Sequence, residues 1–128
     1  MKQLKVTASY TSKKTNVNVE VPLLSFIEDK SHIIYCPALD LSGYGKTETE
    51  AKKSFEIHLH EYLQYTTNKN TLWIDLKKLG WTIKKNLKKP AVPPAMSHLL
   101  ETNEEFNRIF NNYSYKKFDT GISLPAYA

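Results

Sequence analysis

The residues of this chain that could most readily bind a ligand form a lysine-rich stretch around one tryptophan. They are Lys77, Lys78, Trp81, Lys84, Lys85, Lys88 and Lys89. Such lysines can contact a phosphate backbone, and an exposed indole ring can stack on a base. In the structural alternative, the lysines suit a helix C-terminus and an edge strand, and Trp81 alternates with Ile83 as an inward face. We favour this alternative and keep nucleic-acid binding as a second hypothesis.

Carboxylates are the residues that a metal-dependent nuclease would need, and their positions do not suit one. Two metal ions that bridge the attacking and leaving oxygens of a phosphate require several converging carboxylates. The first two expected strands offer only Glu20, on the face opposite its flanking valines. Asp40, Glu48 and Glu50 have turn or capping explanations. We therefore expect a protein that is not an enzyme.

The histidines and the single cysteine do not form a recognisable metal or redox motif. His58 and His60 are two residues apart on an expected helix, so they point to nearly opposite faces. His32 and His98 belong to other elements, and Cys36 has no second cysteine to pair with. We expect no cofactor and no metal, and a role that depends on surfaces.

Length and composition predict a single domain with a packed core. The chain has 128 residues, of which 41% are hydrophobic, enough to fold without a disulfide or metal. Its net charge is +5, but Arg108 is the only arginine, which weakens the indication of nucleic-acid binding. The N-terminus lacks an apolar run of secretory length and no window suits a membrane span, so we expect a cytoplasmic protein without membrane contact.

The first half of the chain is expected to form a small antiparallel sheet. Residues 4–8, 17–21 and 31–36 are predicted strands with polar turns between them, and residues 41–46 add a short extended piece. Residues 16–36 are therefore predicted to form a β-hairpin.

The clearest helix follows this sheet. Thr47 and Glu50 form a capping box, in which the glutamate is expected to reach back to the amide of Thr47. An apolar stripe then recurs at helical spacing, made of Ala51, Phe55, His58, Leu59 and Tyr62. This stripe predicts that the helix covers one face of the sheet.

The second half of the chain is more irregular. A short helix is predicted over residues 71–79, ended by Gly80 in a left-handed conformation, and a strand follows at 81–83. The proline-rich residues 90–94 are expected to be a connector outside any ladder.

The last part of the chain is predicted to be a helix followed by a strand. Thr102 and Glu105 suggest a second capping box, and a terminal strand at 118–124 is expected at a sheet edge of its own or a partner subunit. We therefore divide the chain into an α+β domain at 1–89 and a helix-strand extension at 90–128, which we expect to serve in oligomerisation.

The block of residues 34–51 resembles the characteristic segment of HicB-like antitoxins, and the resemblance extends over residues 31–68. In that family a strand ends in a proline and an acidic-leucine pair, then passes through a glycine turn into a threonine-capped helix. This chain supplies each part in order, with Pro37, Asp40, Leu41, Gly43, Gly45, Thr47, Glu50 and Ala51. The alternative is that any strand, glycine turn and capped helix would use these residue types.

The resemblance implies a degenerate ribonuclease H-like fold, with a sheet of three or four strands covered by one main helix. It also implies an antitoxin that binds and blocks a small HicA-like ribonuclease toxin. HicB proteins typically carry a C-terminal DNA-binding segment, but here a helix precedes the terminal strand, and residues 97–112 are short for a helix-turn-helix. DNA binding is therefore in doubt.

Two functions follow as hypotheses. The first is an antitoxin-like protein that sequesters a basic ribonuclease, although the positive net charge argues against a simple mimic of RNA. The second is a nucleic-acid-binding module that uses the lysine-rich stretch. Under either hypothesis we expect a homodimer or a higher homo-oligomer, because strand edges and aromatic residues are plentiful.

Overall fold

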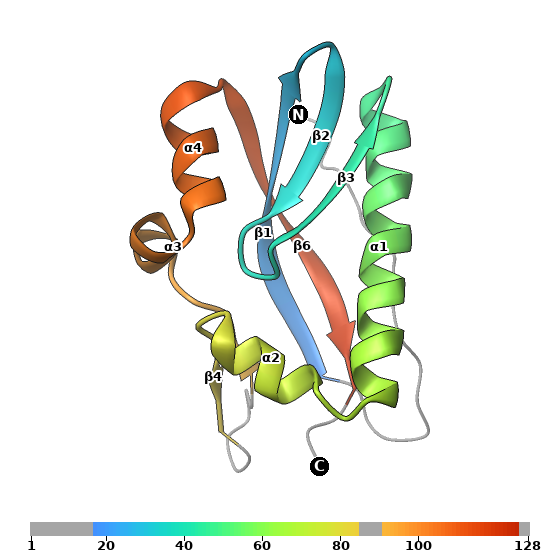
Figure 1. Ribbon diagram of the computed structural model, residues 1–128, viewed down its shortest axis with the longest axis vertical. Coiled ribbons are helices and arrows are strands. Elements are labelled where there is room, and N and C mark those ends of the chain that lie inside the picture. The colour runs from blue at the N-terminus through green and yellow to red at the C-terminus, as the bar shows by residue number, and fades with distance from the viewer. Residues whose placement is uncertain (1–16, 85–90, 126–128) are drawn as a thin grey trace.

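The protein folds around a four-stranded antiparallel sheet with helices on both faces (Figure 1). The computed structural model describes residues 17–84 and 91–125. The strand order is β3-β2-β1-β6. The strands are β1 (Val17–Glu28), β2 (Ser31–Cys36), β3 (Leu41–Gly45) and β6 (Tyr115–Leu124). The predicted α+β class, with a small sheet and one main helix, is confirmed; the expected strand at 4–8 lies outside the described residues.

The central strand β1 is buried on both faces near its middle. Val21 and Leu23 point to one face of the sheet and Leu24 and Phe26 to the other, and all four are buried. A half-covered strand would alternate apolar and polar residues throughout. The run Leu23-Leu24 breaks that alternation because each face has its own hydrophobic layer.

The first layer is α1 (Glu48–Asn68), which packs along β2 and β3. Thr47 caps it as predicted, since its hydroxyl accepts from the amide of Glu50 at 3.2 Å. The second half of the predicted box is wrong, because the Glu50 carboxylate accepts from the amide of Lys46 at 2.8 Å and not from that of Thr47. The buried residues of the helix are Ala51, Phe55, Leu59, Leu63 and Thr66.

The second layer consists of α3 (Met96–Thr102) and α4 (Glu104–Asn112), which lie on the opposite face of the sheet (Figure 1). The predicted cap at Thr102 is wrong. Asn103 is the N-cap of α4, and its side chain accepts from the amide of Phe106, whereas the Thr102 hydroxyl donates to the carbonyl of His98. Between these helices and the sheet lies a separate apolar cluster. It consists of Leu24, Phe26, Ile33, Tyr35, Leu99, Phe106 and Ile109.

A smaller unit closes one end of the molecule. It contains α2 (Leu72–Lys78) and a two-stranded ribbon of β4 (Thr82–Ile83) and β5 (Ala91–Val92). Gly80 has a φ of +99°, as predicted for the residue that ends the helix. The connector expected at 90–94 does enter a ladder, because Ala91 and Val92 keep the amide protons that the flanking prolines lack.

The C-terminal residues are part of the main sheet. β6 pairs with β1 over ten residues, from Val17 opposite Leu124 to Phe26 opposite Tyr115. Ile122 and Leu124 belong to the same buried cluster as Val19 and Val21. A boundary at residue 89 therefore does not separate two cores, and the terminal strand adds to the sheet of its own chain.

None of the helices in residues 17–84 and 91–125 is both long and apolar enough to cross a bilayer.

Candidate binding groove

Two adjoining cavities lie between the end of β2, α3 and α4. Their volumes are about 550 and 360 Å³, and they share Asp40 and Glu105 in their linings. The larger cavity extends toward the C-terminal end of α2, and the smaller one toward the β1–β2 hairpin. We call the two cavities together the α4 groove.

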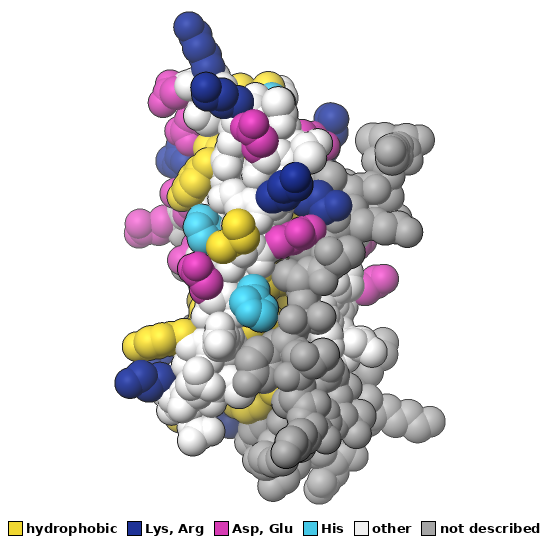
Figure 2. All heavy atoms as spheres, turned by 90° about the vertical axis from the view of Figure 1, so that its right-hand side faces the viewer, with side chains coloured by type: hydrophobic (Ala, Val, Ile, Leu, Met, Phe, Trp, Pro, Cys, Tyr) yellow, Lys and Arg dark blue, Asp and Glu magenta, His cyan; other side chains and the backbone are white. Residues whose placement is uncertain are grey.

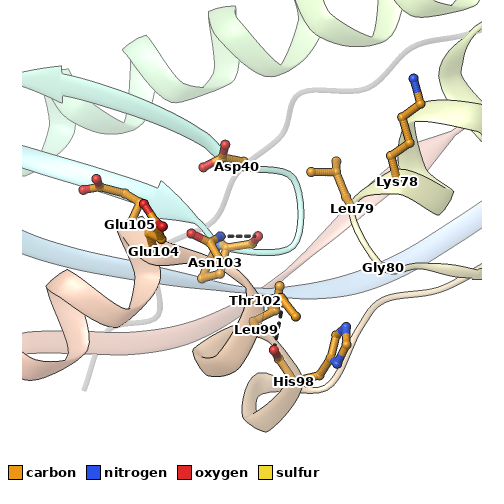
Figure 3. Close-up of a pocket in the computed structure, with 11 residues that line it drawn as sticks. Asp40, Lys78, Leu79, Gly80, His98, Leu99, Thr102, Asn103, Glu104 and Glu105 are labelled. Atoms are coloured by element: carbon orange, nitrogen blue, oxygen red, sulfur yellow. Dashed lines mark hydrogen bonds between the residues drawn. The ribbon is translucent and has the colours of Figure 1, made fainter.

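Acidic side chains line one side of the larger cavity, and a lysine and a histidine line the other (Figure 3). Asp40, Glu104 and Glu105 gather on one side, while Lys78 and His98 lie on the other. Asp40 comes from the β2–β3 turn, and the two glutamates come from the first turn of α4.

Asp40 is held in place by a short chain of hydrogen bonds. Its φ of 52° is left-handed, a conformation that aspartate tolerates better than most residues. The Tyr35 hydroxyl donates to its carboxylate at 2.6 Å and accepts from the Asn103 amide at 2.8 Å. Burial, and then the bond to Asp40, raise the pKa of Tyr35 above its ordinary value, so the phenol remains a donor. The Asp40 carboxylate is therefore oriented before any ligand arrives.

A second network of hydrogen bonds holds side chains at the smaller cavity in place. Arg108 donates to Glu28 at 2.9 Å, and it also bonds Glu105 and the hydroxyl of Tyr113. Tyr113 donates to Glu28 at 2.6 Å. Hydrogen bonds from Arg108, and then from Tyr113, lower the pKa of Glu28. The single arginine of the chain thus connects α4 to the β1–β2 hairpin.

The α4 groove is locally acidic in a chain that is basic overall. Its lining contains four carboxylates, from Glu28, Asp40, Glu104 and Glu105, against the two cations Lys78 and Arg108. Arg108 is already paired with two of the carboxylates. The net charge of +5 is therefore not spread evenly over the surface. A cationic segment of a partner would fit this charge distribution.

The lysine-rich stretch does not form the base-stacking site considered from the sequence. Trp81 is only 4% exposed, and its indole N–H donates to the carbonyl of Ala38 at 2.8 Å. Its ring is therefore part of the core and not available to a base, which overturns its assignment as a binding residue. Lys77, Lys78 and Lys84 are exposed. The predicted residues Lys85, Lys88 and Lys89 lie outside the described part of the chain.

His58 and Cys36 have structural surroundings. His58 bonds the carbonyl of Ser42, while His60 is exposed on another side of the same helix. Within residues 17–84 and 91–125, no three His, Cys, Asp or Glu side chains converge as metal ligands. Cys36 is fully buried, and that burial raises the pKa of its thiol to about 12.

The outer side of α1 has no comparable concentration of one charge. In Figure 2, lysines and carboxylates are interspersed there with single hydrophobic side chains and histidines, over the part of the face that the structure describes. The groove on the other side of the sheet is the more distinctive binding surface.

Sequence reasoning missed the α4 groove because its residues are far apart in the chain. Glu28 and Arg108 are 80 residues apart, and Tyr35 and Asn103 are 68 apart. One local signal was present, since Asn103 followed by Glu104 and Glu105 is a helix start with two carboxylates in its first turn.

The chain was compared with protein-family models, with curated proteins and with solved structures, and none of the three comparisons found a significant match.

Proposed function

We propose that this protein is a HicB-like antitoxin, or a descendant of one, that sequesters a small basic ribonuclease of the HicA type through protein–protein contacts. The observation that carries the proposal is the α4 groove, an acidic cavity on a chain of net charge +5. A ribonuclease binds RNA through cationic residues, and carboxylates can occupy such residues in place of phosphates. The positive net charge of the chain is thus compatible with inhibition of a basic ribonuclease, because the ribonuclease would contact the acidic α4 groove and not the whole surface.

The preorganisation of the groove supports this role. Asp40 is oriented by Tyr35, and Glu28 and Glu105 are oriented by Arg108. Fixed side chains lose little conformational entropy when a partner binds, so more of the interaction energy appears as affinity. Glu104 is exposed and able to meet a cation directly.

The geometry of the HicB-like block supports the proposed ancestry. β2, the turn at Asp40, β3 and the cap at Thr47 form one continuous unit that sets α1 against the sheet. Gly43 and Gly45, two of the glycine positions of the block, lie where the backbone of α1 comes close to β3.

Affinity purification from the native host tests the proposal. Tagged wild-type protein is compared with an Asp40→Asn/Glu104→Gln variant, and recovered proteins and nucleic acids are identified by mass spectrometry and sequencing. The matched control is Glu20→Gln/Glu61→Gln, which removes two exposed carboxylates outside the groove. We expect a small basic protein with the wild type and the control, and its loss with the groove variant. Recovery of nucleic acid alone, or of the same partner with all three proteins, would overturn the proposal.

A second candidate is binding of nucleic acid through exposed lysines. Lys77 and Lys78 at the end of α2, together with Lys84, could contact phosphates, but without stacking by Trp81. This function predicts weak binding that falls steeply as the salt concentration rises. Binding that is unchanged when the three lysines are replaced by glutamine would exclude this candidate.

A further inference from the structure

The outward edge of β3 is contacted by side chains of α1. In an antiparallel pair, alternate residues direct their backbone groups toward the neighbouring strand and away from it. In β3, Ser42 and Tyr44 direct backbone groups away from β2 and toward α1. The Ser42 carbonyl lies 2.6 Å from Nδ1 of His58, and the Tyr44 amide donates to the hydroxyl of Ser54 at 3.1 Å.

The approach that permits these bonds depends on two glycines. A Cβ added to Gly43 would lie 2.2 Å from the backbone nitrogen of Phe55, and one added to Gly45 would lie 2.4 Å from Cβ of Glu50. Any larger residue would therefore move the helix away from the strand. With glycine at both positions, α1 comes close enough for Ser54 and His58, one turn apart, to reach the edge.

We propose that Ser54 and His58 are an edge-capping pair that prevents another strand from adding to β3. An edge strand presents unpaired amides and carbonyls, which are a template for pairing with another chain. An incoming antiparallel strand would need the Ser42 carbonyl and the Tyr44 amide, and both are already bonded to α1. Two of the motif glycines thereby acquire a role in protecting the sheet from self-association.

The bond to the Ser42 carbonyl determines which ring nitrogen of His58 carries the proton. A carbonyl can only accept a hydrogen bond, so Nδ1 of His58 must carry the proton. In the neutral ring Nε2 then has the lone pair. His60, which is exposed on the same helix, provides an internal reference for this assignment.

Three measurements on the full chain test the edge-capping pair. We expect ¹⁵N NMR of the neutral ring to show the Nδ1–H form for His58. In a Ser54→Ala/His58→Ala variant the Tyr44 amide should exchange with solvent roughly tenfold faster, as expected for one lost hydrogen bond. The mean mass measured by light scattering should also rise more steeply with concentration than in the wild type.

The controls separate edge capping from a general loss of packing. Lys53→Ala/His60→Ala removes neighbouring side chains that are exposed on the same helix and should leave exchange and mass unchanged. With Ser54 present, the single variant His58→Ala should associate more than the wild type, whereas His58→Gln, which keeps an N–H donor, should retain the wild-type mass. The proposal is overturned if His58 is the Nε2–H form, if the alanine pair behaves like the control, or if the glutamine variant associates as strongly as His58→Ala.

Discussion

The two faces of the sheet are covered by helices in different ways. On one face, α1 is a single helix of 21 residues whose buried side chains pack against the strands and whose backbone contacts Gly43 and Gly45. On the other face, two short helices of seven and nine residues are attached through an apolar cluster and through the polar side chains of Asn103 and Arg108.

The two kinds of attachment have different consequences for stability and for binding. Continuous apolar contact excludes water and contributes most to the free energy of unfolding. Polar attachment of short helices leaves the cavities of the α4 groove and places carboxylates around them. We infer that the α1 face mainly stabilises the fold and that the α4 face provides the binding surface.

The largest expected effect is on the α1 face. Phe55 is fully buried, and Phe55→Ala should lower the free energy of unfolding by about 3 to 5 kcal/mol through lost contacts and a cavity. Ile57 on the same helix is 57% exposed, and Ile57→Ala should have a much smaller effect. Urea denaturation measures both, and equal effects would contradict the assignment of the core to this face.

A second test adds volume where α1 contacts β3. Gly43→Ala should destabilise the protein by about 1 to 3 kcal/mol, because the new methyl group would overlap the backbone of Phe55 and Ala51. The matched control is Gly121→Ala in β6, where a Cβ meets no atom within 4 Å. A Gly43 variant as stable as the Gly121 variant would show that the contact is not tight.

The attachment of the α4 face is tested at Asn103. Asn103→Ala removes the cap of α4 and the bonds to Tyr35 and Pro37, and should cost about 1 to 2 kcal/mol. Asn103→Asp keeps the capping oxygen but lacks the N–H donors, so it should lose only the attachment to β2. Hydrogen exchange across α4 distinguishes the variants, and identical profiles for both would indicate that the cap contributes nothing.

The smallest expected effect is the pH dependence of the bond between the hairpin and α4. The pKa of Glu28 is lowered in the folded protein by Arg108 and then by Tyr113, so this carboxylate stabilises the fold above its ordinary pKa of 4.5. That contribution is lost as the pH falls through the lower folded pKa. In Arg108→Gln, stability should fall less steeply over this range than in the wild type, as measured by thermal unfolding between pH 6 and about 3. If the stability of the variant and of the wild type changed with pH in parallel, the Glu28–Arg108 pair would make no contribution to the pH dependence.

Oligomeric state remains a prediction. The sequence suggested a homodimer or a higher homo-oligomer through exposed strand edges. Of the two positions allowed for the terminal strand, the structure shows the edge of its own sheet, next to β1. The edge of β3 is partly occupied by Ser54 and His58. β6 is the edge strand on the other side of the sheet.

Elements that depend on near neighbours in the chain could be predicted from the amino-acid sequence. The strand of residues 31–36, the cap at Thr47 and the left-handed Gly80 follow from alternation, capping chemistry and backbone freedom, which act within a few residues. The choice of Thr102 as a cap failed because Asn103, one residue later, caps the helix by accepting from the amide of Phe106, and its side-chain amide also donates to Tyr35.

The composition of the groove and the burial of Trp81 depend on contacts between distant parts of the chain. The groove joins Asp40 to Glu105 and Glu28 to Arg108, and no local pattern connects residues so far apart. The alternation of Trp81 with Ile83 favoured a core position over a stacking surface, and the bond of Trp81 to Ala38, 43 residues away, shows the core position. The physical reason is that burial and charge pairing depend on which elements the fold brings together, whereas helix caps and strand periods depend on the chain itself.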